Sequence, residues 1–388
     1  MGEQGVAVAQ ANDSALERLY VVIMAGGSGT RFWPASRRER PKQLLELVAD
    51  GPLLANTIDR LAGLVPLSRV FVVTAERLLA ATRAAVPALP PAHVIGEPVA
   101  RNTAPCLSVA AAIAAGHRRD AIVALLPADH HVADPEAFRR ALGAAALACD
   151  GGRITTLGVV PTYPETGYGY IETRSAETTA GGAADLTQTA DQQPRDVVRF
   201  VEKPNLDTAS AFLLGGRHLW NAGVFVGRAD ALEAAIAAHL PALAQAARPL
   251  QSLFASMGPT ALGAPSLLSA LAELFAQAPA ISIDNGIMEH QHDLRVVPLV
   301  AGWSDVGSWR SLLDFGAEAA GFVRGDVIAE DCSGCVLVSD GPTVAALGLR
   351  DVAVVAHAGA VLVLPLDRSQ DVRRLVDRLA AAGRDELL

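Results

Sequence analysis

Met24-Ala-Gly-Gly-Ser-Gly-Thr-Arg-Phe-Trp-Pro34 follows directly on the strand-like run 20–24, and this junction decides the fold. Glycines after a buried strand let backbone N–H groups approach a polyphosphate that side chains would block. The stretch is not a Walker A loop, because Gly-Lys-Ser/Thr is absent, and Phe32 stands where a G-x-G-x-x-G loop has its third glycine. It therefore predicts a phosphate-binding loop of another kind, with a plain glycine turn as the alternative.

Strand-like and helix-like segments alternate along the first part of the chain. Short runs of mostly aliphatic and β-branched residues indicate buried parallel strands at 20–24, 70–74 and 121–126. Segments of helical length, rich in Ala and Leu, lie at 53–64, 104–115 and 135–148. This alternation predicts an α/β fold, a Rossmann-like mixed sheet flanked by helices. Ligands of such sheets gather beyond the carboxyl ends of the strands, so we expect 25–31 and 127–131 to converge there.

The pattern changes after 154–160, where shorter strands are expected at 170–173 and 197–201. Between these two strands, the stretch 175–194 is rich in Thr, Ala, Gly, Asp and Gln, which predicts a mobile hairpin loop. Alanine and leucine dominate 230–278, and this composition predicts helices packed on the flank of the sheet.

Short valine-rich runs recur in the last part of the chain, at 336–338, 352–355 and 361–364, before a helical segment at 369–382. They predict a small β-rich C-terminal domain with a terminal helix, and their period is too irregular to predict a solenoid. The expected organisation is a flexible tail over 1–18, a catalytic domain over 19–320 and the C-terminal domain over 321–388.

Composition and charge narrow the class of protein. The chain has 388 residues, 51% of them hydrophobic, which is enough for a large domain and a smaller one. Its formal net charge of -9 argues against a general nucleic-acid surface, because contacts to phosphate backbones need clustered Lys and Arg. The segment 1–18 lacks the basic start and apolar run of a signal peptide, and later apolar runs are too short to span a bilayer. We therefore expect a cytoplasmic protein without nucleic-acid or membrane partners.

The cysteines predict neither a disulfide framework nor a metal site. They are Cys106, Cys149, Cys332 and Cys335, and only the last two are close, as a lone C-x-x-C without a second pair. Ordinary reduced thiols are the favoured interpretation.

The loop at 24–34, together with Pro41-Lys42-Gln43, resembles the signature of sugar-nucleotide pyrophosphorylases and is most similar to that of mannose-1-phosphate guanylyltransferases. The match includes residues that a glycine turn does not require. The resemblance implies a glycosyltransferase-A-like nucleotidyltransferase fold, in which Arg31 and Lys42 neutralise charge on the phosphates. It also implies that the loop binds the nucleotide through Ala25, Gly26, Gly27, Ser28, Gly29 and Thr30. By residue type alone, the alternative for Lys42 is a solvated surface lysine, which is the commoner fate of lysines.

The segment 97–105, Glu-Pro-Val-Ala-Arg-Asn-Thr-Ala-Pro, precedes an alanine-rich helical run, so Asn102 or Thr103 is a candidate N-cap. The segment also resembles the guanine-side motif of the same family. That resemblance implies that Glu97, Arg101 and Asn102 shape the base pocket, and base contact is favoured over capping alone.

Leu126-Pro-Ala-Asp-His-His131 ends a buried strand, where an acid is well placed to hold a metal ion. The resemblance implies that Asp129 and Asp305 coordinate a Mg²⁺ that bridges the α-phosphate and the sugar phosphate. The alternative for Asp305 is helix capping, since it precedes a helix-like segment. His130 and His131 are expected to be structural, because adjacent residues of an extended segment point in opposite directions.

Two motifs, 164–170 and 200–204, flank the expected hairpin loop as neighbouring strands would. The resemblance implies that the backbone near Gly167 and the side chains of Glu202 and Lys203 hold the sugar and its phosphate. Lys203 would be the phosphate cation and Glu202 a hydroxyl acceptor.

Two more residues complete the expected sugar side. Asn221 can both donate to and accept from sugar hydroxyls, or can serve as a turn residue before Gly223. The stretch 282–289 resembles the sugar-side acidic motif of the family and implies a role for Asp284, although an aromatic residue is more usual where Asn285 stands.

The implied reaction is in-line attack of a mannose 1-phosphate oxygen on the α-phosphorus of GTP, giving GDP-mannose and pyrophosphate. Catalysis would come from positioning and from screening of charge by Mg²⁺, Arg31, Lys42 and Lys203. One alternative is a pyrophosphorylase for another pair, such as glucose 1-phosphate with UTP or dTTP. Another is a catalytically silent sugar-nucleotide-binding regulatory subunit. We expect a single activity, without phosphomannose isomerisation, and leave a homodimer open.

Overall fold

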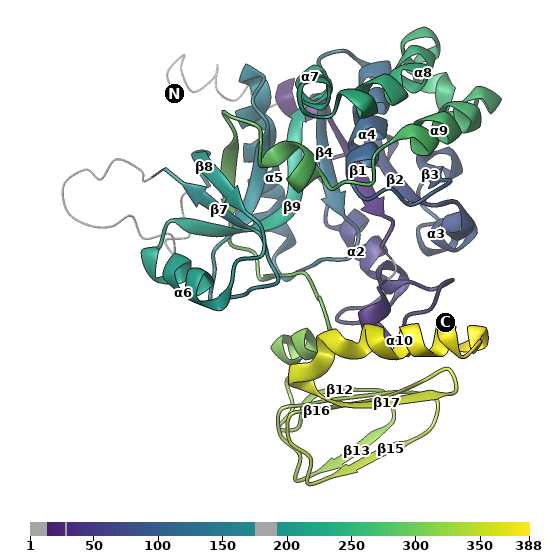
Figure 1. The fold of residues 1–388 in the computed structure, drawn as a ribbon, viewed down its shortest axis with the longest axis vertical. Helices are drawn as coiled ribbons and strands as arrows, with labels where there is room; N and C mark the ends of the chain where they lie inside the picture. Colours follow the sequence, from purple (N-terminus) through teal and green to yellow (C-terminus); the bar gives the residue numbers. More distant parts are fainter. Residues whose placement is uncertain (1–13, 28, 175–191) are drawn as a thin grey trace.

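The computed structural model describes residues 14–27, 29–174 and 192–388, which form two parts (Figure 1). The larger part is a nine-stranded sheet between helices, and the smaller part holds the C-terminal strands. The predicted tail and hairpin loop lie mostly outside the described residues. Where the tail is described, 14–17 is helical and Ala15 is buried in the main core.

Four parallel strands form one half of the large sheet. They are β1 (Leu19–Ala25), β2 (Val70–Ala75), β3 (Val94–Glu97) and β4 (Ile122–Pro127), in the order β3-β2-β1-β4. The register places Val21 beside Val70 on one side and Ala124 on the other. Side chains on both faces are buried because helices cover both sides of a parallel sheet. The predicted parallel strands are confirmed.

The other half of the sheet makes it mixed. It continues from β4 through β9 (His218–Arg228), β6 (Thr155–Val159), β10 (Arg295–Leu299), β8 (Arg195–Val201) and β7 (Tyr170–Thr173). Strand β9 runs antiparallel to both β4 and β6. Beside the sheet, β5 (His131–Val132) pairs antiparallel with β11 (Trp303–Ser304). That short pairing joins the segment after β4 to the segment that carries Asp305.

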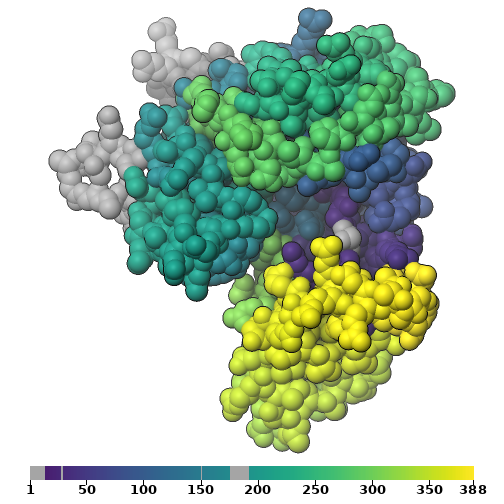
Figure 2. Space-filling model, viewed as in Figure 1, coloured from purple at the N-terminus to yellow at the C-terminus, as the bar shows by residue number. Residues whose placement is uncertain are grey.

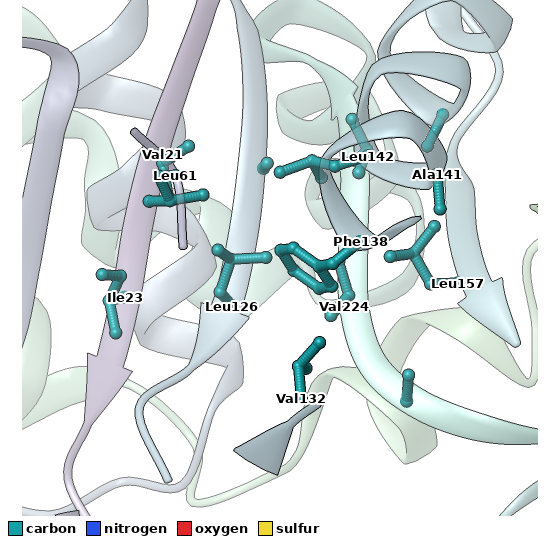
Figure 3. Packing of buried hydrophobic residues seen from close by; sticks show 14 of the residues in the cluster. Val21, Ile23, Leu61, Leu126, Val132, Phe138, Ala141, Leu142, Leu157 and Val224 are labelled. Atoms are coloured by element: carbon teal, nitrogen blue, oxygen red, sulfur yellow. The ribbon is translucent and has the colours of Figure 1, made fainter. Parts of the chain in front are cut away.

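Helices bury one hydrophobic cluster on each face of the sheet. The first face is covered by α2 (Leu53–Asp59), α3 (Leu79–Ala85), α5 (Pro135–Ala148) and α6 (Leu206–Gly215). The second face is covered by α4 (Ala104–His117), α7 (Ala229–His239), α8 (Pro241–Met257) and α9 (Pro265–Gln277). Figure 3 shows Phe138 and Leu142 packing beside Leu126 and Val224. The predicted helices exist, although α2 ends at Asp59 rather than at residue 64, where the chain continues in turns.

The smaller part is a short parallel β coil, which confirms the predicted β-rich C-terminal domain, although the sequence period was too irregular to predict a solenoid. Strands β12 (Gly321–Arg324), β14 (Cys335–Asp340) and β16 (Val352–His357) pair in parallel, as do β13 (Val327–Glu330) and β15 (Val344–Leu347). Paired residues lie 14 apart for Gly321 and Cys335 but 17 apart for Val336 and Ala353. The coils differ in length, which hid the period in the sequence. Strand β17 (Ala360–Pro365) closes the sheet antiparallel, and α10 (Val372–Ala381) follows it.

In Figure 1, α10 lies between the small coil and the large part. No helix in the described part of the chain has the length and apolar character that crossing a membrane requires.

Candidate active site

A cavity of about 480 Å³ opens at the carboxyl ends of β1 and β4, within the size range of small-molecule sites. The predicted convergence of the glycine loop with the segment after β4 is confirmed, because Ala25 and Asp129 both line it. The cavity brings together most of the residues that the sequence singled out. Those lining it are Ala25, Gly26, Gly27, Glu97, Arg101, Asn102, Asp129, Gly167, Glu202, Asn221, Asp284 and Asp305.

Other predicted site residues lie outside this lining. Arg31 is exposed in a single 3-10 turn, Thr30–Phe32, and does not line the cavity. Gly29, Thr30, Lys42 and Lys203 are also absent from the lining. Ser28 lies outside the described residues. The structure thus brings the predicted acids and the two predicted asparagines together at one cavity, whereas the predicted phosphate cations Arg31, Lys42 and Lys203 are not part of its lining.

Lys42 and the two predicted metal ligands form one connected cluster. The Lys42 ammonium donates to Asp129 Oδ2 at 2.8 Å and to the main-chain oxygen of Asp305 at 2.6 Å. Lys42 is only 6% exposed, so the surface-lysine alternative is wrong. The Lys42 charge is paired with Asp129 in this structure, and its role in neutralising phosphate charge stays a prediction. The antiparallel pairing of β5 with β11 is what carries Asp305 to this point.

Charges around Asp129 keep its carboxyl ionised. Burial opposes ionisation, but the charge of Lys42 and the hydrogen bond that it donates outweigh it, so the pKa of Asp129 lies below its usual value. Burial lowers the pKa of His130 to about 4, which makes that imidazole neutral at pH 7. The indole Nε1–H of Trp303 donates to His130 Nδ1 at 3.2 Å. This contact agrees with the structural role expected for His130.

The donor set at this point fits Mg²⁺. Two oxygen atoms contact the positive charge of the Lys42 ammonium. One belongs to the Asp129 carboxylate, and the other is the main-chain oxygen of Asp305. Carboxylates are hard ligands, and Mg²⁺ completes its shell with water and substrate phosphates rather than with an all-protein cage. No cluster of three or more His, Cys, Asp or Glu side chains suited to a metal occurs among the described residues.

Asp305 is not a helix cap. The 3-10 segment after it, Trp309–Phe315, has Ser308 as its N-cap, with a reciprocal side-chain contact to Ser311. The Asp305 carboxylate instead accepts a hydrogen bond from the Tyr168 hydroxyl at 2.7 Å. Burial and the neighbouring charge of Asp305 raise the pKa of Tyr168, so the hydroxyl keeps its proton and remains a donor. Tyr168 was missed in the sequence, although it stands inside the quoted motif 164–170.

Aromatic neighbours hold Tyr168 in place. Its ring makes edge contacts with Trp220 and Trp303, with centroids 5.2 and 5.5 Å away. A partner that orients a metal ligand typically changes metal affinity about 10- to 100-fold when it is lost. We expect Tyr168→Phe to raise the Mg²⁺ concentration needed for half-maximal turnover by about tenfold, because Asp305 loses its orienting donor. Titration of turnover with Mg²⁺, and of the protein with Mn²⁺ by electron paramagnetic resonance, measures this change.

Tyr170→Phe is the matched control for that prediction. It removes a hydroxyl that donates to the Glu165 carbonyl at 2.8 Å and does not line the cavity. Its Mg²⁺ dependence should equal that of the wild type. An unchanged Mg²⁺ requirement in Tyr168→Phe would show that Tyr168 does not orient Asp305.

The base-side residues Arg101, Asn102 and Thr103 make other contacts than the side-chain cap of α4 that the sequence allowed. Thr103 is the N-cap of α4, but its side chain does not cap the helix and instead accepts from the Ile283 N–H at 2.9 Å. Asn102 lies in the left-handed region, with φ 62, and its side chain accepts from the Thr103 N–H. Arg101 donates to the Phe275 carbonyl at 2.9 Å, in the last turn of α9. One of the two candidates, Thr103, is therefore the N-cap residue of α4, but neither candidate caps the helix with its side chain.

Glu97 is the acid closest to the glycine loop. A Cβ built on Gly26 would lie 3.3 Å from Glu97 Oε2, so the carboxylate lies over the loop backbone. Burial raises the pKa of Glu97 to about 7. Among the described residues nothing hydrogen-bonds its carboxylate, which leaves both oxygens as acceptors. Cys106, which also lines the cavity, has its pKa raised by burial and then by Glu97, as befits the unreactive thiol expected.

The sugar-side residues form a hydrogen-bonded group at the opposite wall. Asn221 lies inside β9, donates to Asp284 Oδ1 at 2.6 Å and accepts from the Gly223 N–H at 3.0 Å, so it also performs the turn role that was the alternative. Burial and the charge of Glu202 raise the pKa of Asp284. Glu202 forms an ion pair with Lys203, whose side chain is 62% exposed.

The unusual Asn285 lies apart from this wall. It is exposed, and its side chain bonds to Ser282 and Glu289 rather than lining the cavity. The departure from the family pattern therefore falls outside the pocket. Several further lining residues were not named as site residues. Among them are Gln43, which donates to the Ala25 carbonyl at 2.6 Å, and Trp303.

A mixed α/β sheet whose cavity joins a glycine-rich loop to two acids from distant segments defines a nucleotidyltransferase. Residues 20–320 match the family model described as nucleotidyl transferase, and residues 325–379 match one described as MannoseP isomerase/GMP-like beta-helix domain. This chain belongs to the nucleotidyl transferase family, in its group of mannose-1-phosphate guanylyltransferases. The family and fold expected from the sequence are confirmed.

Individual relatives support that assignment. The mannose-1-phosphate guanylyltransferase of Escherichia coli (strain K12) is 37% identical over 96% of this chain and 76% of that protein. The xanthan biosynthesis protein XanB of Xanthomonas campestris pv. campestris (strain B100) is 38% identical over 94% of this chain and 74% of that protein. A crystal structure from Thermus thermophilus, described as a mannose-1-phosphate geranyltransferase, is 34% identical with a TM-score of 0.81, and it covers 94% of this chain and 99% of that chain.

Proposed function

We propose that this protein transfers GMP from GTP to α-D-mannose 1-phosphate, giving GDP-mannose and pyrophosphate, as a cytoplasmic, Mg²⁺-dependent enzyme. The observation that carries the proposal is the cluster of Asp129, Lys42 and Asp305 beside a glycine loop, at one cavity with the base-side acid Glu97. Similarity to proteins named mannose-1-phosphate guanylyltransferase supports the choice of substrates.

The nucleotide is assigned to the wall formed by the glycine loop and Glu97. Gly26 and Gly27 line the cavity, and backbone N–H groups of such glycines are suited to phosphate oxygens. The Glu97 carboxylate is an acceptor, and guanine presents N–H donors at N1 and N2 where uracil and thymine present a single N–H. An acidic acceptor therefore favours guanine over the pyrimidine bases.

The acceptor sugar is assigned to the opposite wall. The linked pair Asn221 and Asp284 offers both donors and acceptors to hydroxyl groups. Glu202 adds a further acceptor, and Lys203 is the proposed cation for the sugar phosphate. The exposed side chains of Lys203 and Arg31 reach bound phosphates by rotation about their own bonds.

Chemistry needs no covalent intermediate on the protein. Both reactants are anionic, so the protein must align an oxygen of mannose 1-phosphate with the α-phosphorus of GTP and offset their repulsion. Asp129 and Asp305 are the residues that would hold Mg²⁺, which neutralises charge between the two phosphates when bound. Lys42 fixes the position of both acids and links them to the glycine loop.

A substrate matrix tests the proposal. Pyrophosphate release should be measured for GTP, ATP, UTP and dTTP, each with mannose 1-phosphate and glucose 1-phosphate. We expect kcat/KM for GTP with mannose 1-phosphate to exceed every other pair by about 100-fold or more, since a site built on hydrogen bonds rejects partners that leave them unmade. Preference for another pair would replace this assignment, and binding of GDP-mannose without turnover of any pair would indicate a regulatory subunit.

Glu97 gives a separate prediction about pH. Its folded-state pKa of about 7 lies above the ordinary 4.5, so the residue favours the folded state only while protonated. That contribution is complete below pH 4.5 and is lost as the pH rises through 7. We expect Glu97→Gln to raise the Tm relative to wild type at about pH 8 but not at pH 4.5, measured by thermal unfolding across that range.

The same variant should weaken GTP binding at about pH 8 by about tenfold or more, because the amide replaces a charged acceptor with a neutral one. Glu136→Gln, on the exposed side of α5, is the control and should alter neither property. If the Tm of Glu97→Gln and that of wild type depended on pH in the same way, the raised pKa of the buried Glu97 would be contradicted.

A further inference from the structure

A third hydrophobic core joins the two parts of the molecule, and it draws on both site segments. Phe32 and Trp33 come from the segment that follows the glycine loop, and Val306 and Trp309 come from the segment that carries Asp305. The C-terminal part contributes Phe322, Val336, Val355, Leu362, Leu366 and Val372. Figure 2 shows the corresponding contact, with yellow atoms of the C-terminal end beside purple atoms of the N-terminal region.

Specific hydrogen bonds fasten this core. The Trp33 indole Nε1–H donates to the Leu387 carbonyl at 2.8 Å, and Arg38 pairs with Asp385 at 2.9 Å. The Trp309 indole Nε1–H donates to the Trp33 carbonyl at 3.1 Å. Trp33 therefore lies between two partners, one from the last turn of the chain and one from the Asp305 segment.

The core also reaches the charged centre of the site. The ring of Phe32 has Trp309 on one side, with centroids 5.0 Å apart, and the Lys42 ammonium lies 6.0 Å from its centroid. Phe32 and Trp309 are fully buried. Arg31 precedes Phe32 in the same 3-10 turn, so the backbone that carries Arg31 is held by a side chain locked in the core.

We propose that the C-terminal domain is a positioning element of the active site. Through Trp33 and Trp309 it holds the backbone of the triphosphate-binding segment and that of the Asp305 segment in one fixed relation. Trp33 and Trp309 are positioning residues, and they touch no reacting atom. This inference rests on the proposed phosphate role of the loop.

The physical reason for such a support is that a glycine-rich loop has little rigidity of its own. Glycines lose more conformational entropy on ordering than other residues, and this loop contains three of them, Gly26, Gly27 and Gly29. A loop that must match a triphosphate gains from an external support, because a misplacement of about 1 Å can reduce turnover about 100-fold. The residues Phe32-Trp33, which a phosphate turn does not need, supply that support.

The test uses Trp33→Phe in the full chain, with inorganic pyrophosphate and GTP as probes. The variant keeps an aromatic ring in the core but cannot donate to Leu387. We expect its affinities for pyrophosphate and GTP, measured by calorimetric titration, to fall about tenfold while KM for mannose 1-phosphate is unchanged. A second variant, the chain shortened after Gly383, removes the Leu387 acceptor and the Asp385 partner of Arg38. Combined with Trp33→Phe, it should add little further loss, because both remove the same contact.

Leu375→Ala is the control, since it lies on the outer side of α10, 43% exposed, and perturbs the same helix without touching Trp33. It should lower Tm but leave pyrophosphate affinity unchanged. Unchanged pyrophosphate affinity in Trp33→Phe would overturn the inference, whether or not the shortened chain folds. If pyrophosphate affinity falls as expected but wild type does not turn over GTP with mannose 1-phosphate, the proposed function fails and the positioning role stands.

Discussion

Asp305→Ala is expected to lower kcat by about 1,000-fold or more while the protein stays folded. The residue supplies one of the two carboxylates that would hold Mg²⁺ between two anionic reactants, and removing one preorganised electrostatic contact costs about 100- to 1,000-fold. The loss of kcat should exceed that caused by removing a single hydrogen-bond donor, because removing the Asp305 carboxylate also weakens the binding of Mg²⁺. Initial rates of pyrophosphate release and Mn²⁺ binding, both at saturating GTP, measure the two parts of this effect.

Asp134→Ala serves as the control for Asp305→Ala. Asp134 caps α5, where its carboxylate accepts from the N–H groups of Glu136 and Ala137 at 3.0 and 2.9 Å. Its loss should cost about 1 kcal/mol of stability, as is usual for an N-cap, with turnover close to that of wild type. Turnover of Asp305→Ala within about tenfold of wild type, on the same scale, would remove Asp305 from the metal site.

Gly29→Ala is expected to reduce turnover about 100-fold and to destabilise the fold. A Cβ at this position would lie 2.4 Å from the Lys42 Cβ and 2.6 Å from the Lys42 backbone nitrogen, so no change of rotamer relieves the overlap. The loop or Lys42 must move, and Lys42 then loses its geometry with Asp129. A shift of about 1 Å in such a site is sufficient for a loss of this size. Turnover and thermal unfolding measure the effect.

Gly51→Ala separates the clash from backbone strain. Gly29 and Gly51 have φ 60 and 78, but a Cβ on Gly51 would meet nothing within 4 Å. The control should therefore show only the left-handed cost of about 1–2 kcal/mol, with turnover preserved. Equal turnover in the two variants would mean that contact between the loop and Lys42 does not govern activity.

Much of the catalytic fold was predictable from local pattern. The β-branched run that became β1 and the alanine-rich segment that became α5 each carry their own periodicity, and their boundaries follow from turn residues and a cap. The C-terminal coil was not predictable as a solenoid, because its coils of 14 and 17 residues share no fixed repeat. The parallel pairing of these strands depends on contacts between segments that are distant in the sequence, and the local sequence of each segment does not specify its partner.

The same division applies to the site. Motif residues such as Asp129 and Asp284 could be named because each follows a strand or lies in a recognisable segment. The partner of Asp305 could not, since Tyr168 precedes it by 137 residues and only folding places the two within 2.7 Å. Arg31 was expected at the phosphates, and only the structure shows that its side chain is exposed, beside the buried Phe32 and outside the cavity lining.

The sequence by itself determined the class of protein. A glycine-rich loop after a strand and acids at the ends of strands are local features, and each can be recognised from neighbouring residues together with the ligand chemistry that it allows. Only the tertiary structure decided how charge is distributed among them: Lys42 became a buried partner of Asp129, and the C-terminal coil packed beneath both site segments. The physical reason is that side-chain direction and pairing depend on packing between segments far apart in the chain, and no local pattern contains that information.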